Sequence, residues 1–428
     1  MTRTLFFLTL GLVWVTAARA QDASVVRGRV LFQNECSRCH VPIEMDARLR
    51  ARWVGRTGQE LYEQIRSTMP AETPGSLSND EYYDLTAFIL QSGNVNIDDG
   101  SMAVSALARL EINPAVVAVT NDVAETVNWT HYHGDERATR YVPFDQINAD
   151  NVDQLQIAWS LDTGPFGPNP ETYSTATPLM VNGRLFTTAG ATRNVVALDA
   201  ASGQLLWMWR PQEDERFDAA PRKGSGKGLA WYSDGAEEVI FTMTPGYYLV
   251  ALNARTGDPV ESFGAGGFVD LQQGLRRGPG RQDLDIGITF PPMVVEDVVI
   301  TGAAHEVGMR PVSASNVKGD IRGWDANTGE LLWTFKTIPE PGEKGYETWL
   351  NGAASYTGNA GVWAPMSADP ERGHVYLPVE SATGDRYGGE RHGNNLFSSS
   401  TVALDYRTGE MQWYFQTTHH DIWDWDTP

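Results

Sequence analysis

The residues best suited to chemistry stand near the start of the chain, in the stretch Cys36-Ser-Arg-Cys39-His40. Two thiols at this spacing can join one porphyrin covalently, and the adjacent imidazole is then placed to bind the iron. A thioredoxin-like redox pair does not need the histidine, and a zinc site needs further ligands close by. These are the two cysteines of the chain. The motif therefore predicts covalent haem c on Cys36 and Cys39, with His40 as an axial iron ligand.

The second axial ligand is expected to be Met69, in the phrase Ser-Thr-Met69-Pro. A thioether is among the side chains that complete haem iron coordination. Met45 stands too close to His40 to reach the opposite haem face, and Met102 falls beyond the last predicted helix. The phrase, with Pro-Gly-Ser-Leu-Ser-Asn-Asp-Glu81 after it, resembles the methionine loop of the small class-I cytochromes c.

Three helices are expected to position these ligands, over residues 24–34, 59–68 and 79–91. Ser78 is the expected N-cap of the third helix, and Glu81 completes a capping box. This helix also repeats apolar residues at helical spacing, at Tyr82, Leu85, Phe88 and Ile89. The pattern predicts a small all-α cytochrome c domain.

The first residues predict export. A basic start, an apolar run from Leu5 to Val15 and an Ala-Arg-Ala20 end make a secretory signal peptide over residues 1–20. The mature chain would begin at Gln21 and would hold no transmembrane segment, because no other apolar run reaches about 18 residues. Export agrees with haem c attachment, so the periplasm is the expected location.

Composition and charge limit the remaining possibilities. The formal net charge of −21 argues against binding to nucleic acid or to an anionic membrane surface. We expect the cytochrome c domain over residues 21–97, a linker over 98–120 and a second domain over 121–428. The 42 glycines and 14 tryptophans favour an all-β architecture for that larger domain.

One phrase recurs four times in the second domain: Asp or Asn, then Ser-Gly or Thr-Gly at a fixed spacing, and in three copies a Trp four positions later. Each copy predicts a strand, a tight turn and a second strand whose Trp can dock against the next unit. The second copy carries Glu261 instead of Trp, and Trp159 precedes the first copy as the outer strand of a closing blade. The glycines that mark the copies are Gly203, Gly257, Gly329 and Gly409. Such a repeat indicates a β-propeller.

This repeat resembles the Trp-docking repeat of the quinoprotein dehydrogenases. The resemblance implies an eight-bladed propeller that binds pyrroloquinoline quinone (PQQ) and calcium at its axis. Because the chain carries four copies, about half of such a propeller is expected here, and the sequence is expected to be a C-terminally truncated fragment. An unusual small propeller is the alternative.

The segment His-His-Asp421-Ile-Trp-Asp424 resembles the His-Asp-x-Trp-Asp motif of the same family. The resemblance makes Asp424 the catalytic base, which must take the proton of the substrate hydroxyl. Asp421 is the rival residue, although an aspartate at that position more often holds local structure.

Two further segments resemble the metal-binding part of that family. Gly-Ala-Ala-His-Glu306 implies that Glu306 binds calcium, although a solvated loop carboxylate is the alternative. Thr383-Gly384-Asp385 matches a phrase found near the cofactor in the glucose-dehydrogenase branch. Gly384 stands where the methanol-type branch has a metal-binding Asn, so Thr383 and Asp385 are the expected substitutes, Thr383 toward PQQ and Asp385 toward calcium.

Three residues are expected to hold PQQ on the same grounds. Trp363 aligns with the tryptophan on which the PQQ ring stacks, although a lone Trp is usually a core residue. Thr289 matches a hydroxyl donor to the cofactor. Lys227 stands where relatives carry an Arg that contacts a PQQ carboxylate, and it keeps the charge without the bidentate geometry.

Together the two domains predict a periplasmic quinohaemoprotein dehydrogenase. A small-molecule alcohol or sugar would be oxidised at PQQ, and electrons would pass through haem c to an external acceptor, either a cytochrome or a quinone-linked chain. The alternative is a non-enzymatic quinoprotein-like propeller fused to an electron-transfer cytochrome.

Overall fold

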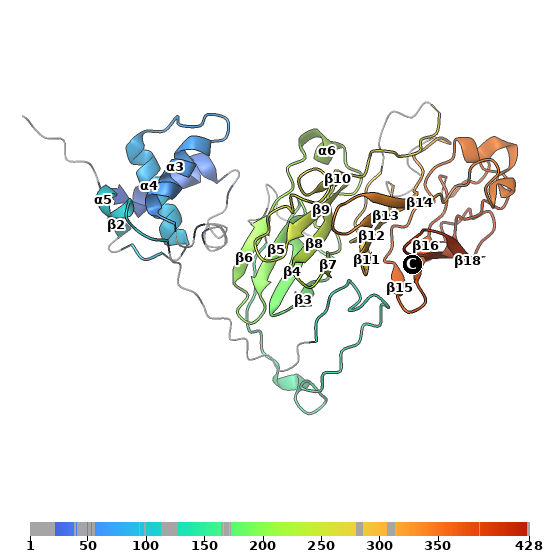
Figure 1. The fold of residues 1–428 in the computed structure, drawn as a ribbon, viewed down its shortest axis with the longest axis horizontal. Coiled ribbons are helices and arrows are strands. Elements are labelled where there is room, and N and C mark those ends of the chain that lie inside the picture. The colour runs from blue at the N-terminus through green and yellow to red at the C-terminus, as the bar shows by residue number, and fades with distance from the viewer. Residues whose placement is uncertain are drawn as a thin grey trace, which may run out of the picture. The chain divides into compact units, whose positions relative to one another are not determined.

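The structure is a computed structural model. It describes residues 22–37, 40, 49, 53, 56–93, 95–97, 100–112, 127–163, 166, 171, 173–279, 286–305, 313–384 and 386–425. The chain forms two compact units (Figure 1), the first from Met1–Pro42 and Trp53–Ala115 and the second from Ile43–Arg52 and Val116–Pro428. The predicted signal peptide lies outside the described residues. No helix of the described residues has the length and apolar character needed to cross a membrane.

The first unit is built from helices where the sequence predicts them. They are α1 (Val25–Leu31), which continues into the π-helix η1 (Phe32–Cys36), α3 (Gly58–Thr68) and α4 (Asn79–Ser92). The capping box of Ser78 and Glu81 is confirmed, and Thr57 and Glu60 form a second one at the start of α3. Each box satisfies backbone N–H groups that would otherwise lack a partner at a helix start.

Helices α1 and α4 cross at Gly28. A Cβ atom there would lie 2.0 Å from the carbonyl oxygen of Asp84, so only glycine permits this close approach. Phe32 and Phe88 pack beside the crossing with ring centroids 5.2 Å apart. The buried carboxylate of Asp84, on α4, accepts a hydrogen bond from Arg27 Nε, on α1, at 2.7 Å. This bond joins the two helices at the polar edge of their interface. The crossing therefore fixes the helix that ends at Cys36 against α4.

The linker predicted over residues 98–120 differs from the structure, because its described part, 100–112, packs on the first unit. Strand β2 (Ser101–Met102) pairs with β1 (Ala23–Ser24), and the short helix α5 (Val104–Leu107) follows. Leu107 and Ile112 are fully buried. These isolated apolar positions have no period that marks them as an element, so the sequence pattern misses them.

The described residues of the second unit form four antiparallel sheets, each of four strands consecutive in the chain, which confirms a mostly-β, propeller-like fold (Figure 1). The first sheet has β3 (Leu179–Val181), β4 (Arg184–Ala189), β5 (Asn194–Asp199) and β6 (Leu205–Trp209). The second has β7 (Ala230–Ser233), β8 (Glu238–Met243), β9 (Tyr248–Asn253) and β10 (Phe268–Asp270). The third has β11 (Met293–Val295), β12 (Val298–Thr301), β13 (Ile321–Asp325) and β14 (Leu331–Phe335). The fourth has β15 (Ser367–Asp369), β16 (His374–Val379), β17 (Ser400–Asp405) and β18 (Met411–Gln416).

The repeated phrase forms the turn between the third and fourth strands of each sheet. In the third sheet, Asp325 Oδ1 accepts from the backbone N–H groups of Asn327 at 2.9 Å and Thr328 at 2.8 Å. Gly329 then adopts a φ of 72°, which glycine reaches without a steric penalty. Asp199, Asn253 and Asp405 accept equivalent bonds in the other three turns. The turn chemistry therefore explains why the phrase repeats.

Tryptophans join successive sheets as predicted. The indole of Trp207 lies on Gly257 of the second sheet, where a Cβ atom would come within 2.5 Å of the ring. Its N–H donates to Ala254 O at 3.0 Å. Trp333 repeats the arrangement in the fourth sheet, donating to Tyr406 O at 2.9 Å, and Trp159 does so in the first. The segment around Trp159 forms no strand, because no described strand lies beside it to pair with.

The junction between the second and third sheets works without a tryptophan. Glu261 stands at that repeat position, and the backbone N–H of Gly264 donates to Thr328 O at 2.8 Å. Val269 packs within 3.0 Å of the Cβ position of Gly329, where an indole lies at the other junctions. Backbone and a small side chain thus replace the missing indole.

Candidate functional site

The candidate cofactor site is built on three segments that each run into the first strand of a sheet. We call residues 224–229, 286–292 and 358–366 the entry loops. They carry Lys227 before β7, Thr289 and Phe290 before β11, and Trp363 before β15. Equivalent positions in successive sheets of a propeller face a common axis, so the repeat itself brings these side chains together.

Backbone hydrogen bonds join the first entry loop to the second and tie the first and third loops to neighbouring segments. Lys227 N donates to Thr289 O at 2.8 Å, and Lys227 O accepts from Thr177 N at 2.9 Å. Farther along, Ala303 N donates to Val362 O at 3.1 Å, next to Trp363. The positions of the candidate side chains are therefore set by main-chain bonds between sheets.

Lys227, Phe290 and Trp363 form a cluster at the centre of the candidate site. The Lys227 ammonium lies 4.4 Å from the ring centroid of Phe290 and 5.8 Å from that of Trp363. The two rings are 6.0 Å apart. Partial burial, followed by the nearby charge of Arg222, lowers the pKa of Lys227. A desolvated cation above an aromatic floor suits a flat anionic ligand, because the ring binds its face and the ammonium binds its charge.

A second group of side chains lies on the segment that pairs with the third entry loop. Glu380 N donates to Gly361 O at 2.9 Å, and Thr383 N donates to Gly358 O at 3.0 Å. The buried hydroxyl of Thr383 has no hydrogen-bond partner among the described residues. An unpartnered buried hydroxyl is costly, so this group is available to a ligand that the protein binds.

The two rival aspartates have opposite surroundings. Asp421 is fully buried, and its carboxylate accepts from Ser399 Oγ and from the backbone N–H groups of Trp423 and Trp425, each at 2.9 Å. Asp424 is half-buried, and a 3.4 Å contact from Ser381 Oγ is its one side-chain hydrogen bond among the described residues. Asp421 therefore stabilises the loop, while the carboxylate of Asp424 can still accept hydrogen bonds from another partner.

Sequence reasoning missed three contributors to this site. Phe290 lies beside both Lys227 and Trp363, and it belongs to the same phrase as the predicted Thr289. Ser381 precedes the matched Thr383 phrase and reaches Asp424. The fully buried Arg391 donates to Asn395 Oδ1 at 2.9 Å, Thr383 O at 3.2 Å and the carbonyl of Asp421. Adjacency to the motif could have indicated Phe290 and Ser381, but nothing local marks Arg391.

In the first unit, the described haem-motif residues lie at the end of η1. His40 N donates to Cys36 O at 2.9 Å, which closes one turn between the thiol and the imidazole. Met69 is the C-cap residue of α3 and, like Cys36 and His40, is half-buried. A thiol next to an imidazole, with a thioether on a separate loop, is the donor set that haem c requires.

Three predicted site residues, Cys39, Glu306 and Asp385, lie outside the described residues. Both carboxylates expected to bind calcium are therefore among the residues whose geometry is not described. In the part of the chain that the structure describes, no group of three or more His, Cys, Asp or Glu side chains is arranged to hold a metal ion.

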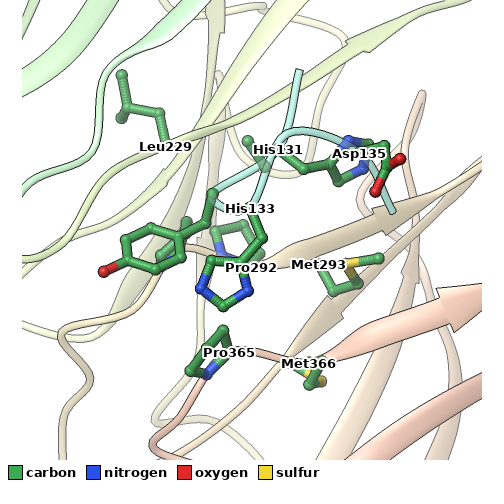
Figure 2. A pocket seen from close by; sticks show the side chains of 11 residues that line it. His131, His133, Asp135, Leu229, Pro292, Met293, Pro365 and Met366 are labelled. Atoms are coloured by element: carbon green, nitrogen blue, oxygen red, sulfur yellow. The ribbon is translucent and has the colours of Figure 1, made fainter. Parts of the chain in front are cut away.

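A small cavity of about 20 Å³ lies beside the entry loops, which contribute Leu229, Pro292 and Pro365 to its wall (Figure 2). His131 and His133 line it, but both imidazoles have partners. His131 Nε2 lies 2.9 Å from Val294 O, and His133 Nε2 lies 2.6 Å from the Arg140 guanidinium. Burial, and then Arg140, lowers the pKa of His133, so its ring accepts that bond in the neutral form. Both imidazoles therefore serve as packing and hydrogen-bonding groups behind the entry loops.

Comparison with known proteins agrees with the repeat. Residues 129–428 match the family described as "PQQ: Glucose/ethanol/alcohol dehydrogenase, beta-propeller domain". The chain is 34% identical over 313 residues to the glycerol dehydrogenase large subunit of Gluconobacter oxydans (strain 621H), covering 70% of this chain and 40% of that protein. It is 32% identical over 363 residues to the quinohemoprotein alcohol dehydrogenase ADH-IIG of Pseudomonas putida, covering 78% and 46%.

A solved structure shows the same fold. The quinohemoprotein alcohol dehydrogenase from Comamonas testosteroni superposes with a TM-score of 0.58 at 27% identity, covering 71% of this chain and 43% of that one. The chain spans less than half the length of the curated relatives named above. Because the family match covers well over half of the sequence, the chain belongs to the PQQ-dependent glucose/ethanol/alcohol dehydrogenase β-propeller family.

Proposed function

We propose that this chain carries the cofactor site of a periplasmic quinohaemoprotein dehydrogenase that oxidises an alcohol or a sugar hydroxyl. The observation that carries the proposal is the cluster of Lys227, Phe290 and Trp363 on equivalent entry loops. The unpartnered hydroxyl of Thr383 supports it, since a bound cofactor would supply the missing partner. The four described sheets would then belong to an eight-bladed ring.

The residues present fit PQQ. Trp363 would stack on its ring system, Lys227 would bind a carboxylate, and Thr383 and Thr289 would donate hydroxyl hydrogen bonds. PQQ, when bound, supplies a quinone that takes up hydride from a carbon bearing a hydroxyl group. The protein must remove the hydroxyl proton, and we assign this task to the carboxylate of Asp424. Ser381 would hold that carboxylate through Oδ1.

Calcium is part of the same proposal. Glu306 and Asp385 would supply oxygen ligands, which are the ligands that calcium prefers, and the cation would polarise the quinone. Gly384 in place of an amide ligand leaves Thr383 and Asp385 to complete the set. Calcium-dependent protection of the apoprotein against thermal unfolding, lost in Glu306→Gln, is the expected result.

The first unit would be the cytochrome c domain over residues 21–97. Cys36 and Cys39 would hold haem covalently, with His40 and Met69 on the iron. Electrons from the oxidised substrate would leave through this haem to an external cytochrome or a quinone-linked chain. The test is the haem spectrum of Met69→Ala beside Met102→Ala. Loss of the sulfur-to-iron charge-transfer band in Met69→Ala alone is expected, and an unchanged band would reject Met69.

The dehydrogenase proposal is tested with full-length protein loaded with PQQ and calcium. Asp424→Asn should retain PQQ binding, measured by tryptophan fluorescence, and lose haem reduction by alcohols and sugars. Lys227→Met should bind PQQ at least about tenfold more weakly. The exposed Lys223→Met, in the same connection, is the matched control and should bind normally. Failure of wild-type protein to bind PQQ would overturn the proposal.

A further inference from the structure

A second cavity in the propeller unit lies between the first and second sheets, away from the residues assigned to PQQ. Its volume is about 330 Å³, which is within the size range of small-molecule sites. The end of β6, the connection after it and the turn between β8 and β9 form its walls. Its lining residues are Trp209, Pro211, Gln212, Glu213, Thr244, Tyr248 and Phe268.

Three half-buried aromatic rings form most of the apolar wall. Trp209 and Phe268 come from neighbouring sheets, and their ring centroids are 6.2 Å apart at 46°. Tyr248 meets Phe268 edge-on at 6.4 Å. The outer face of Tyr248 is occupied, because the Arg216 guanidinium lies 3.8 Å from its ring centroid. Trp209 and Phe268 are therefore the rings that a ligand could contact.

Among the polar residues of the wall, Glu213 supplies the one carboxylate. Glu213 Oε2 accepts from Gly246 N at 2.9 Å, which fixes the side chain. Its other oxygen, Oε1, is buried and has no hydrogen-bond partner among the described residues. A carboxylate oxygen can only accept, so this atom calls for a donor from a ligand. Leaving a buried acceptor unpaired costs free energy that such a donor would recover.

Two arginines near the cavity, Arg193 and Arg216, each already interact with a carboxylate. Burial lowers the pKa of the Arg193 guanidinium to about 10. The negative charge of Glu213 opposes that shift because it stabilises the cation. Arg216 is paired with Asp270 at 2.9 Å. Because these arginines already face carboxylates and Glu213 Oε1 needs a donor, the cavity favours a neutral molecule with hydroxyl donors.

We propose that this cavity binds a neutral, ring-shaped polyol, either a pyranose or a cyclitol. One hydroxyl donates to Glu213 Oε1, and the C–H face of the ring packs on Trp209 and Phe268. The site is independent of the proposed quinone chemistry, because none of its lining residues belongs to the entry loops. It gives the propeller a second place to hold a carbohydrate-like molecule without oxidising it.

Saturation-transfer NMR on the full chain, without added PQQ, tests the proposal. Methyl α-glucopyranoside and myo-inositol are the probes, and tetramethylammonium is the cation probe. Saturable transfer from the polyols is expected, with little from the cation. Glu213→Ala and Trp209→Leu should each weaken polyol binding at least about tenfold. Trp209→Leu leaves the Glu213–Gly246 bond in place, so it tests the site even if Glu213→Ala disturbs the turn.

Two matched controls and one competition complete the design. Glu215→Ala changes an exposed carboxylate two residues away, and Trp413→Leu changes a tryptophan of the fourth sheet. Both should bind the polyols like the wild type, and excess PQQ should not displace them. The proposal is overturned if polyols give no saturable signal, if the cation binds instead, if Glu213→Ala and Trp209→Leu bind normally, or if PQQ competes. The last result would assign binding to the quinone site.

Discussion

The tryptophan junctions between sheets and the entry loops differ in how completely their polar groups are paired. At the junctions, Trp207 and Trp333 are buried, and each indole N–H has a carbonyl partner. In the entry loops and the segment beside them, Lys227 contacts rings and Thr383 keeps an unpartnered hydroxyl. Paired groups hold the fold, whereas unpaired ones in a folded, ordered setting remain available to a ligand.

The same contrast occurs within the four residues 421–424, in the loop after β18. Asp421 has three hydrogen bonds, and Asp424 has one long contact to Ser381. Because both residues are aspartates in one loop, residue type and sequence position cannot account for the difference. Hydrogen bonding therefore separates the structural carboxylate from the candidate base.

The largest expected effect is at a junction. Trp333→Ala should lower the free energy of unfolding by about 3–5 kcal/mol, because it empties a buried indole site and leaves Tyr406 O without its donor. Trp413→Ala, at the same repeat position in the fourth sheet, should cost about 1 kcal/mol or less, since Trp413 is 44% exposed. Urea unfolding followed by circular dichroism measures both, and equal losses would contradict the contrast.

The next effect separates the two aspartates. Asp421→Asn should cost about 2–3 kcal/mol, because an amide NH₂ would face donors where a buried carboxylate now accepts. Asp424→Asn should stay within about 0.5 kcal/mol of the wild type, since it loses one long contact and Asn tolerates the φ of 60° found there. The same unfolding assay compares them. A larger loss for Asp424→Asn would make Asp424 a structural residue.

The sequence predicted what short-range chemistry determines. The Asp325 turn and the capping box at Ser78 each follow from residues within a few positions. The docking of Trp207 on the next sheet was predicted because the same phrase repeats along the chain. The sequence did not predict Phe290 under Lys227, or the bond from Ser399 to Asp421, because these pairs meet only when separate strands and loops pack. The sequence also did not predict that the backbone N–H of Gly264 would replace an indole at one junction, because every residue type except proline carries a backbone N–H. The site residues Glu306 and Asp385 stay predictions.

A smaller effect concerns the charge of Lys227. Because burial and Arg222 lower its pKa, the ammonium loses its proton at a lower pH than an exposed lysine does. PQQ affinity should therefore be full below that lowered pKa and fall as pH rises through it, by about tenfold in total. Fluorescence titrations across pH measure this fall. Lys227→Met should bind weakly at every pH, and a wild-type fall that persists in Lys227→Met would assign the titration to another group.

The smallest expected effect is in the helical unit. There the hydroxyl of Tyr82 is hydrogen-bonded to Met69 O, whereas the ring of its neighbour Tyr83 stacks on Tyr62. The fully buried Tyr82 hydroxyl donates to Met69 O at 2.8 Å and accepts from Leu77 N at 3.4 Å, so it joins both ends of the proposed methionine loop. Tyr82→Phe should cost about 1 kcal/mol. Tyr83 lies on Tyr62 with centroids 4.1 Å apart, and Tyr83→Phe preserves this stacking, so this control should cost less than Tyr82→Phe.

The spectrum gives a second readout that simple destabilisation would not move. If Tyr82 holds the loop, Tyr82→Phe should lose the sulfur-to-iron band at a lower pH than wild type or Tyr83→Phe, because the loop leaves the iron more easily. A wild-type protein without that band would remove Met69 as a ligand, yet the stability comparison of Tyr82 with Tyr83 would still stand. A band that survives to the same pH in all three proteins would show that Tyr82 stabilises the helices without positioning Met69.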